Sequence, residues 1–467
     1  MSADWVEYSL GDLGVIKTGK TPPAKIVDAY GGVVPFITPR DMDGRKWIIT
    51  TERYLSDNGL EAVKNSLVPP RSVAVSCIGS DMGKAVMVEK SSVTNQQINT
   101  IVVDEIKYNA EFVYYNLSAR QEELKGIASG SATPILNKGH FSNVNILLPS
   151  KNDQNAIVDI LRSIDDKIEL NRQINQTLEE MAQAIFKSWF VDFEPVKAKI
   201  EAKANGQDPE RAAMCAISGK TDAELDLLPH DQLAQLRATA ALFPDELTDS
   251  ELGLAPKGWE VKTVEDLSTI VAMGPFGSNI KVSTFVNEGV PVISGTHLNG
   301  TLLEDSEFNY VTESHAERLK KSVVYRGDVI FTHAGSIGQV AYIPDKSKYE
   351  KYVLSQRQFY MRPDSDQISS LFIVQYFKSH IGQHNLLANT SQVGVPSISR
   401  PVSYLRTIKL VVPGKELSDI YDGVVRPLHT AYTGNINQEK TLIVLRDTLL
   451  PKLLSGEIEL AANPISS

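Results

Sequence analysis

Residues Asp153 to Phe193 read DQNAIVDILRSIDDKIELNRQINQTLEEMAQAIFKSWFVDF. Apolar or amide side chains recur there in alternating steps of four and three residues, at Ile157, Leu161, Ile164, Ile168, Asn171, Asn175, Leu178, Ala182, Ile185 and Trp189. This spacing is typical of the seam of a coiled-coil helix. Asp153 is suited to cap the helix and Pro195 to end it, so about forty residues would form a rod roughly 60 Å long.

A second seam with the same spacing occurs 264 residues further along the chain. Its positions are Tyr421, Val425, Leu428, Tyr432, Asn435, Glu439, Leu442, Arg446, Leu449 and Leu453. Asn171 and Asn175 lie at the middle of the first seam, and Asn435 and Glu439 lie at the middle of the second. Buried asparagine fixes the register of a coiled coil. We therefore predict an antiparallel pair with a polar centre; the alternative is two unrelated amphipathic helices packed on separate domains.

The bulk composition predicts a globular chain of two or three domains, because 467 residues with 42% hydrophobic side chains can form several cores. The start, Met1 to Trp5, has no signal-peptide pattern, and no run of 18 apolar residues occurs, so we expect a soluble, cytoplasmic protein. Cys77 and Cys215 are isolated, which predicts neither a disulfide framework nor a zinc site.

The net charge of −10 is unevenly distributed. Residues 1–150 carry 15 basic and 16 acidic side chains, and residues 258–414 carry 15 and 14. Residues 151–257 carry 12 basic and 20 acidic side chains. Because the two nearly neutral regions can still present basic faces, the charge neither shows nor excludes a nucleic-acid partner.

The expected fold class is α+β: two mixed α/β domains in internal repeat, separated by two long antiparallel helices with pseudo-two-fold symmetry. The expected segments are a first domain (1–152), a long helix (153–194), an acidic linker with a short helix near Asp231–Leu242 (195–257), a second domain (258–414), and a long helix with a tail (415–467). In the first domain we predict strands at Val33–Thr38, Ser72–Cys77, Ala85–Val88 and Thr100–Val103, and a helix near Ala110–Ala119.

The repeat is visible in short matching segments. Val34–Ile37 returns as Val290–Ile293, and Val73–Ser76 followed by Gly79 returns as Val329–Thr332 followed by Gly335. Asn95–Gln97 corresponds to Ser355–Arg357, and Pro134–Lys138 corresponds to Pro396–Arg400.

Gly14 to Thr21 fits the phosphate-loop pattern of two glycines followed by lysine and threonine. Such a loop needs a strand before it and a helix N-terminus after it. Pro22 and Pro23 follow at once, and no convincing strand precedes the motif. A flexible basic loop is the better interpretation, and an ATP-binding enzyme built on this loop is the alternative.

Polar side chains on glycine-rich turns recur at matching places of the two repeats and are the candidates for DNA contacts. Glutamine and asparagine can pair with adenine edges, arginine can pair with guanine, and lysine on a turn can approach a phosphate. The candidates are Lys17, Gly19, Lys20, Thr21, Arg40, Ser80, Lys84, Gln96, Gln97, Asn99, Asn137, Lys138, Ser278, Asn279, Lys281, His297, Ser336, Gln356, Arg357, Ser399 and Arg400. For each residue alone, a solvated turn or a satisfied strand edge is the competing interpretation.

No catalytic or metal-ligating set repeats between the two domains, so we predict no catalytic residues and no metal site. The aromatic end of the first rod is either an internal hydrophobic clasp or a surface that docks a partner. The candidate partner-binding residues are Phe186, Trp189, Phe190, Phe193, Leu449 and Leu453.

Several helical signatures carry a resemblance to a known family. They are Ile168–Leu178, Ala184–Phe193, Phe243–Pro244 with Asp249–Gly253, and Leu445–Gly456, together with the turns Gly19–Pro22 and Gly274–Ser278. With these segments the chain resembles, over nearly its whole length, the specificity subunit of type I restriction–modification systems.

The resemblance implies two target-recognition domains held by the helices, and assembly with two modification (methyltransferase) subunits and with restriction (translocase/endonuclease) subunits. It implies a non-catalytic subunit without a cofactor of its own, with S-adenosylmethionine, ATP and Mg used by the partner subunits. The two unlike domains would read an asymmetric, bipartite site whose halves lie about 34 Å apart, one helical turn of double-stranded DNA. A DNA-recognition scaffold of another methylation-based defence system is a further alternative.

Overall fold

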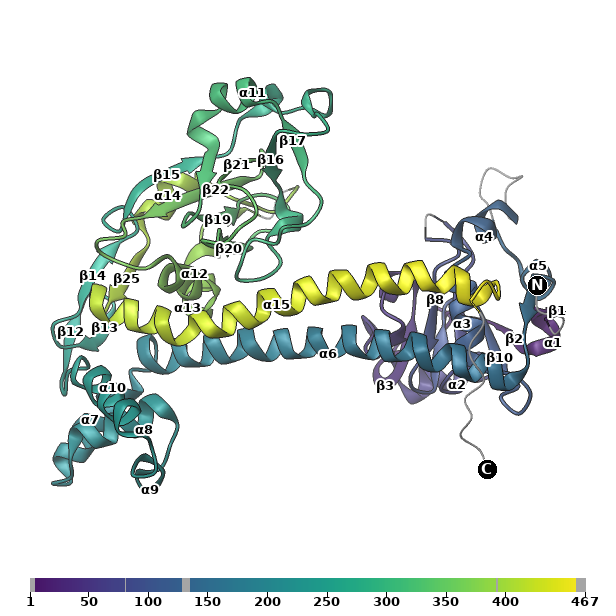
Figure 1. The fold of residues 1–467 in the computed structure, drawn as a ribbon, viewed down its shortest axis with the longest axis horizontal. Helices are drawn as coiled ribbons and strands as arrows, with labels where there is room; N and C mark the ends of the chain where they lie inside the picture. The colour runs from purple at the N-terminus through teal and green to yellow at the C-terminus, as the bar shows by residue number, and fades with distance from the viewer. Residues whose placement is uncertain (1–4, 80, 128–134, 392–393, 459–467) are drawn as a thin grey trace. The chain divides into compact units, whose positions relative to one another are not determined.

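Both predicted rods are single helices in the computed structural model, which describes residues 5–79, 81–127, 135–391 and 394–458. Helix α6 (Lys151–Phe190) and helix α15 (Lys415–Leu454) each contain 40 residues (Figure 1). The chain divides into unit 1, residues 1–172 and 436–467, and unit 2, residues 173–435. Each unit therefore contains one of the two repeats and a part of each long helix.

In unit 1 the first part of α6 pairs with the last part of α15. Arg446 Nη1 lies 3.1 Å from Asp165 Oδ1, and Asn171 Nδ2 donates a hydrogen bond to Gln438 Oε1 at 2.9 Å. Asn171 is completely buried. As residue numbers rise along α6 they fall along α15, so the two helices are antiparallel here.

In unit 2 the second part of α6 pairs with the first part of α15, with the same direction. Asn435 Nδ2 donates to Asn175 Oδ1 at 2.9 Å, and the Tyr421 hydroxyl donates to the Ala182 carbonyl at 3.1 Å. The predicted antiparallel pairing and its polar centre are confirmed. Two unrelated helices on separate domains would not form these contacts.

The ends of α6 differ from the prediction. Ser150 caps the helix, because its hydroxyl accepts from the Asp153 amide at 3.3 Å and donates to the Asp153 carboxylate at 2.7 Å. Asp153 is thus the third residue of the helix, bonded to the cap, rather than the cap itself. The helix ends at Phe190, before Phe193 adopts a left-handed φ of 53°, and Pro195 lies in the first turn of the next helix.

Unit 1 is built on a five-stranded and a four-stranded sheet and a two-stranded ribbon. The five-stranded sheet has the order β2 (Gly14–Thr18), β10 (Ile98–Val103), β7 (Val73–Ser76), β8 (Ala85–Val88) and β4 (Trp47–Ile48). The four-stranded sheet has the order β5 (Arg53–Leu55), β3 (Tyr30–Ile37), β9 (Ser92–Thr94) and β6 (Leu67–Val68), and the ribbon pairs β1 (Val6–Ser9) with β11 (Asn145–Leu148). The four predicted strands are confirmed as β3, β7, β8 and β10, although Thr38, Ser72 and Cys77 lie just outside the observed strands.

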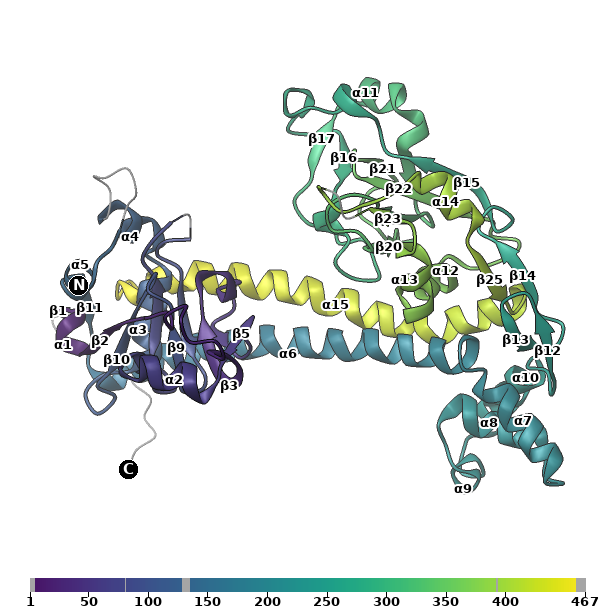
Figure 2. The same cartoon turned by 180° about the vertical axis from the view of Figure 1, so that it is seen from behind.

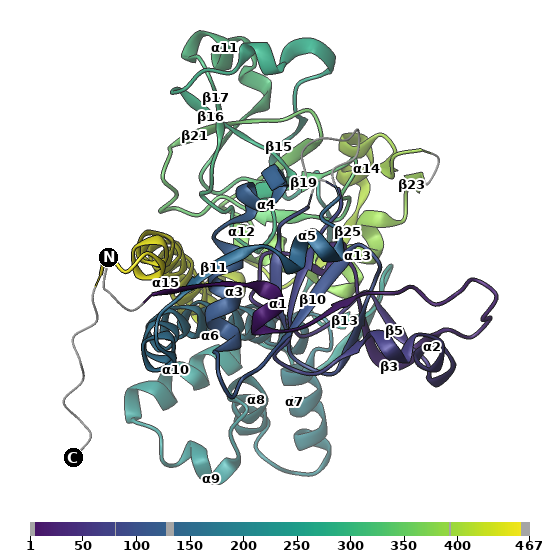
Figure 3. The ribbon, with the colours of Figure 1, turned by 90° about the vertical axis from the view of Figure 1, so that its right-hand side faces the viewer.

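Short helices cover these sheets. They are α1 (Leu10–Leu13), α2 (Asp57–Val63), α3 (Ala110–Ser118), α4 (Gln121–Ile127) and α5 (Lys138–Ser142), with 3-10 turns η1 (Pro39–Asp41) and η2 (Lys64–Ser66). Figure 3 shows α2 beside β3 and β5. Helix α3, the predicted helix, packs on β7 and β8, and its Phe112 shares a core with Leu161 of α6.

Unit 2 repeats the sheets of unit 1, except that in the described residues the counterpart of the five-stranded sheet has four strands and no strand at the place of β4. One sheet has the order β15 (Ser268–Met273), β22 (Gln358–Pro363), β19 (Val329–Thr332) and β20 (Val340–Tyr342). The other has the order β17 (Asn309–Val311), β16 (Val290–Ile293), β21 (Lys351–Leu354) and β18 (Val323–Tyr325), and β14 (Glu260–Thr263) pairs with β25 (Lys409–Val412). The parallel pair Phe36–Val93 in unit 1 returns as Val292–Val353, so the internal repeat is confirmed down to the register.

The helices of this second repeat also match. They are α11 (Glu313–Arg318), α12 (Ser370–Lys378), α13 (His380–Leu387) and α14 (Pro401–Thr407), with 3-10 turns η3 (Gly277–Asn279), η4 (Val282–Thr284), η5 (Gly295–His297) and η6 (Lys320–Ser322) and a ribbon of β23 (Thr390–Ser391) and β24 (Ser397–Ile398). Helix α12 packs on β19 and β20 as α3 packs on β7 and β8. It lies beside α15 in the view from behind (Figure 2), where Ser369, its N-cap, bonds to Asp422 of α15 at 2.7 Å.

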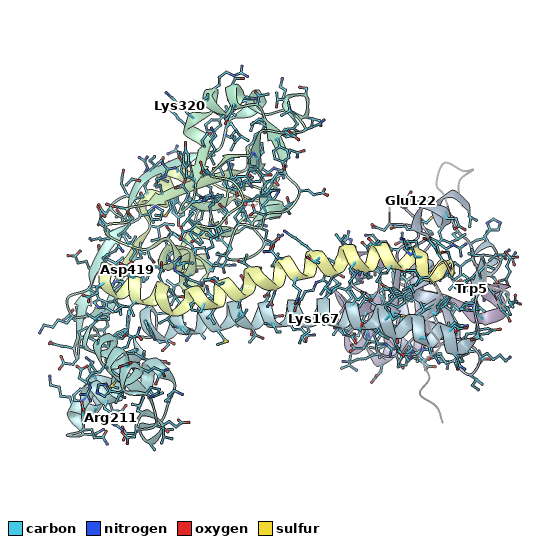
Figure 4. The ribbon with its side chains drawn as sticks, in the orientation of Figure 1. Trp5, Glu122, Lys167, Arg211, Lys320 and Asp419 are labelled. Atoms are coloured by element: carbon cyan, nitrogen blue, oxygen red, sulfur yellow. The ribbon has the colours of Figure 1, made fainter. Side chains whose placement is uncertain are left out.

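Residues 195–257 contain more structure than the predicted short helix. Four helices and a ribbon form there: α7 (Glu194–Ala204), α8 (Pro209–Ser218), α9 (Asp222–Leu225), α10 (His230–Ala241), β12 (Leu247–Ser250) and β13 (Gly253–Pro256). Asp208 caps α8, and a Thr221–Glu224 capping box starts α9. Arg211, labelled in Figure 4, ties α8 to Asp222 and Asp226. The sequence signals were caps and prolines rather than a long apolar stripe.

Candidate nucleic-acid interface

Each unit has a polar cleft at the same place in the repeat. The cleft of unit 1 has a volume of about 570 Å³ and is lined by Thr38, Pro39, Arg40, Glu52, Arg53, Ile78, Gly79, Asp81, Asn95 and Gln97. The cleft of unit 2 has a volume of about 400 Å³ and is lined by Ser294, Gly295, Thr296, Asn299, Thr332, Ala334, Ser336, Gln339, Ser355, Arg357 and Gln358. Several lining residues of the two clefts correspond in the repeat, among them Thr38 with Ser294, Ile78 with Ala334, and Gln97 with Arg357.

One wall of each cleft is a one-turn 3-10 helix with a capping box. The Thr38 amide donates to the Asp41 carboxylate at 2.7 Å, and in unit 2 the Ser294 amide donates to His297 Nδ1 at 2.9 Å. His297 is 3% exposed and stacks on Phe308 with ring centroids 4.4 Å apart. His297 therefore takes the place in unit 2 that the Asp41 carboxylate has in unit 1. This buried, structural position does not support the predicted contact of His297 with DNA.

The opposite wall is a tight turn that begins at Asn95 in unit 1 and at Ser355 in unit 2. The Ile98 amide donates to the Asn95 carbonyl at 3.1 Å, and the Gln358 amide donates to the Ser355 carbonyl at 3.3 Å. The third residue of the turn is Gln97 or Arg357. The Gln97 carbonyl accepts from the Cys77 amide at 2.7 Å, and the Arg357 carbonyl accepts from the His333 amide at 2.9 Å. Both turns thus hold their third side chain at the same backbone position.

The second residue of each turn holds a glycine loop. Thr21 Oγ1 donates to Gln96 Oε1 at 2.5 Å, and Gln356 Nε2 donates to the carbonyls of Gly277 and Ile280 at 2.5 and 2.8 Å. These loops need glycine where they pass the turn, because a side chain at Gly19 would approach the Asn95 carbonyl oxygen to 2.0 Å. The predicted residues Gln96 and Gln356 therefore fasten loops.

Arg40, Gln97, Ser336 and Arg357 are the predicted side chains that the structure brings to the clefts. Arg40, Ser336 and Arg357 are exposed, and Gln97 is half-buried. The Arg357 guanidinium lies over Gly335, whose φ is 87° and at which a Cβ atom would lie 3.2 Å from Nη1. These four are the strongest members of the predicted set.

Other predicted residues have structural partners in the described part of the chain. Lys17 Nζ donates to the Leu67 carbonyl at 2.7 Å, and Lys84 Nζ lies 2.7 Å from Asp81. Asn99 is 3% exposed, and its amide accepts from Thr18 and donates to the Leu136 carbonyl. Its burial gives no support to a base contact.

The remaining predicted residues lie on exposed loops or helix starts. Asn137 caps α5 through the His140 amide at 2.9 Å, and Arg400 caps α14 with a left-handed φ of 46°. Lys20, Lys138, Asn279, Lys281 and Ser399 are exposed. Ser80 lies outside the described residues, and for Ser278 only the backbone, in η3, is described.

Sequence reasoning missed part of each cleft. Arg53 enters the first cleft from β5, where its guanidinium lies 5.0 Å from the Tyr30 ring and 5.2 Å from the Phe36 ring. In the second cleft Gln339 donates to the Gly295 carbonyl at 3.0 Å and accepts from Thr332 Oγ1 at 3.0 Å. Arg53 lies on no glycine-rich turn, and Gln339 ends the turn Gly335–Gln339, of which only Ser336 is among the predicted residues.

The phosphate-loop alternative does not fit the structure. Gly14–Thr18 is strand β2, paired along its whole length with β10, so the first glycine of the motif is not in a loop. No helix begins at Lys20 or Thr21; the amides of Gly19 and Lys20 instead donate to the carbonyls of Ile98 and Thr94. The helix N-terminus that would hold a phosphate is missing from this described segment.

The aromatic residues at the end of α6 form an internal cluster in unit 2. Phe186 and Trp189 are each 1% exposed, and the Phe186 ring lies 5.1 Å from Phe372 and 5.7 Å from Tyr421. In unit 1 Leu453 is 2% exposed and shares a core with Leu449. The burial of Phe186, Trp189 and Leu453 favours the internal clasp, whereas Phe193 and Leu449 are half-buried, so partner binding by these residues stays a prediction.

A buried ionic network fastens the first domain to α6. Glu111 of α3 accepts from Lys46 Nζ at 2.7 Å and from Arg162 Nη2 of α6 at 2.7 Å. Burial alone would raise the pKa of Glu111, but hydrogen bonds from Arg162 and Lys46 outweigh it and lower the pKa to about 2. The Tyr115 hydroxyl adds a 2.6 Å bond to Asp165 of α6.

The corresponding contact in unit 2 uses different chemistry. Gln375 of α12 and His429 of α15, which correspond in the repeat to Tyr115 and Asp165, lie 3.4 Å apart through Nε2 atoms. Burial lowers the pKa of His429 to about 4, so the imidazole is neutral at pH 7. Nearby, burial raises the pKa of Asp422 to about 6, although Ser369 bonds to the carboxylate. Each domain is thus fixed to a long helix at the same place.

The described residues contain neither a metal-binding cluster nor a membrane-spanning helix. No group of three or more His, Cys, Asp or Glu side chains there is arranged to hold a metal ion. Within the same residues, no helix combines the length and the apolar character needed to cross a membrane.

Comparison with known proteins gives a family for this architecture. A family model described as Type I restriction modification DNA specificity domain matches residues 2–180 and 256–416. The chain belongs to this family. Each matched segment of this specificity chain contains one complete cleft, so the family resemblance and the structural repeat coincide.

Specificity subunits are also among its relatives and structural neighbours. The chain is 30% identical to the type I restriction enzyme HindI specificity subunit of Haemophilus influenzae, over 98% of this chain and 100% of that one. It is 24% identical to the MjaIX specificity subunit of Methanocaldococcus jannaschii, over 97% and 94% of the two chains. A crystal structure of the S subunit from M. genitalium matches with a TM-score of 0.50 at 14% identity, covering 97% of both chains, which shows a shared fold.

Proposed function

We propose that this specificity chain recognises an asymmetric, bipartite DNA site, with one domain reading each half-site. This proposal rests on one observation. Each of the two domains has a cleft at the same place in the repeat, and the two clefts are lined by different side chains. Arg40, Arg53, Glu52 and Asp81 are the charged residues lining the first cleft, whereas Arg357 alone is charged among those lining the second. Two similar frames with unlike linings suit two unlike half-sites.

The proposed contacts divide into two classes. Exposed lysines on the loops, Lys20, Lys138 and Lys281, would bind phosphates, and the cleft side chains would contact base edges. Phosphate contacts release counterions, so the affinity for DNA should fall steeply as salt rises.

The chain would have no catalytic residues of its own and would position other subunits. We propose two modification (methyltransferase) subunits and restriction (translocase/endonuclease) subunits as partners in the cytoplasm, which would use S-adenosylmethionine, ATP and Mg. Family membership supports this part, because the relatives are each named as the specificity subunit of a type I restriction enzyme.

A genome-wide map of methylated adenines tests the proposal. Cells with the modification subunit alone are compared with cells that carry both the subunit and this chain. We expect one split motif with two different halves to become methylated only when the chain is present. A continuous motif, or methylation that does not depend on the chain, would contradict the proposed function.

A further inference from the structure

We infer that Gln97 and Arg357 are equivalent specificity-determining residues, Gln97 reading an adenine in one half-site and Arg357 reading a guanine in the other. This inference rests on the proposed function. It adds to that function a single position per domain and the base that each position selects.

The first argument is that the two side chains start from one backbone frame. Each residue is third in its turn, and its carbonyl accepts from the residue that follows the neighbouring strand, Cys77 in unit 1 and His333 in unit 2. The carbonyl of the fourth residue of each turn accepts a hydrogen bond from the glycine loop: Ile98 accepts from the Gly19 amide at 3.0 Å, and Gln358 accepts from the Gly274 amide at 2.8 Å. A change at position 97 or 357 therefore alters the side chain within a fixed frame.

The second argument is that the other turn positions are used to hold the frame. Asn95 Oδ1 accepts from the backbone amide of Gln97 at 3.0 Å, and the Ser355 hydroxyl donates to the side chain of Gln358. Gln96 and Gln356, one position later, bond to the glycine loops. The first position, Asn95 or Ser355, also lines the cleft, but its side chain bonds within the turn. The third position is the other one that lines both clefts, and its side chain differs in chemistry between the repeats.

The third argument is the chemistry of the two side chains. The Asn95 amide donates to Gln97 Oε1 at 3.0 Å, which orients the Gln97 amide within the cleft. An oriented glutamine amide matches the N6 and N7 groups of adenine, and an arginine fork matches the O6 and N7 groups of guanine. Arg357 is exposed, lies over Gly335, and is the one charged residue lining its cleft, so its fork can face a base.

The test is to change the two positions one at a time in the full chain, with its cognate modification subunit, and to map methylated motifs. Arg357→Gln should replace one guanine by adenine in one half of the motif, and Gln97→Arg should replace one adenine by guanine in the other half. Methylation of the original site should fall by roughly 5- to 150-fold in each case, which corresponds to about 1–3 kcal/mol per lost bidentate contact. Arg318→Gln and Gln207→Arg, on exposed residues away from both clefts, are the matched controls and should leave the motif unchanged.

The inference would be overturned by an unchanged motif methylated at the normal rate, by a change in both halves, or by a change to a base other than the one stated. Lost methylation with a lowered melting temperature would also overturn it, because the residue would then support the turn. Arg357→Gln could also abolish methylation at an unchanged melting temperature. In that case Arg357→Lys must restore methylation of the original motif at a reduced rate, because lysine can still donate a hydrogen bond to guanine. If Arg357→Lys does not restore it, the inference is overturned. If the unmodified chain directs no split motif, the proposed function itself fails, and this parallel measurement separates the two failures.

Discussion

Asn435 of α15 donates to Asn175 of α6 at 2.9 Å, which joins two amides that are 260 residues apart in the chain. Asn175 is 5% exposed; its Oδ1 accepts this bond, and its Nδ2 has no hydrogen-bond partner among the described residues. A buried amide with few partners costs stability, and its presence at a helix seam favours a role in setting register.

We predict that Asn435→Leu lowers the free energy of unfolding by about 1–3 kcal/mol, because it leaves the buried Asn175 amide without its partner. The double variant Asn175→Leu/Asn435→Leu should lose less than the sum of the two single changes, since it removes both polar groups. Urea unfolding of the full chain measures this. Strictly additive losses would show that the two amides do not act as a pair.

Glu111 gives the first domain a stability that depends on pH. Its pKa is about 2 in the folded chain against an ordinary value of 4.5. A lowered carboxyl pKa contributes stability above the ordinary value, and this contribution is lost as pH falls from about 4.5 to about 2. The lowered pKa corresponds to a contribution on the order of 3 kcal/mol to the free energy of unfolding at neutral pH.

We therefore predict that Glu111→Gln destabilises the chain by on the order of 3 kcal/mol at pH 7, because Lys46 and Arg162 lose their carboxylate. The difference from the unmodified chain should shrink as the pH of the unfolding experiment is lowered toward 2. Glu122→Gln, on a side chain 85% exposed, is the control and should have little effect. A loss that stays constant over this pH range would speak against the ionic role.

The aromatic clasp can be separated from a docking surface by unfolding experiments. Phe186→Ala should lower the free energy of unfolding by about 3–5 kcal/mol, because the ring is buried against Phe372 and Tyr421. Leu227→Ala, on a side chain 83% exposed, should change it by less than about 0.5 kcal/mol. If Phe186→Ala left stability unchanged but weakened assembly with a modification subunit, docking would be the correct interpretation.

The long-range organisation could be predicted from sequence because it depends on periodicity. A seam that repeats over some forty residues, with Asn171 and Asn175 at its centre, leaves few alternatives to a long paired helix. The strands at Val73–Ser76 and Ala85–Val88 were predictable from a different pattern, since a short, mainly apolar run between turns is typical of a buried strand.

The individual site residues were harder to predict, because the same residue type serves opposite purposes in neighbouring positions. Gln96 holds a loop and Gln97 lines a cleft, although both are glutamines at adjacent positions and no sequence pattern distinguishes them. His297 resembles a ligand or base reader in sequence, yet it completes a capping box that uses Asp41 in the other repeat. Arg53 enters the cleft only because β5 pairs with β3, and this pairing has no local signal.

The most direct test of the account exchanges residues 1–150, which end one residue before α6, for those of a relative with a different motif. Methylated motifs are then mapped in cells that carry the exchanged chain and the modification subunit. We predict that one half of the motif changes to that of the relative while the other half is retained. A change in both halves, or in neither, would contradict the assignment of one half-site to each domain.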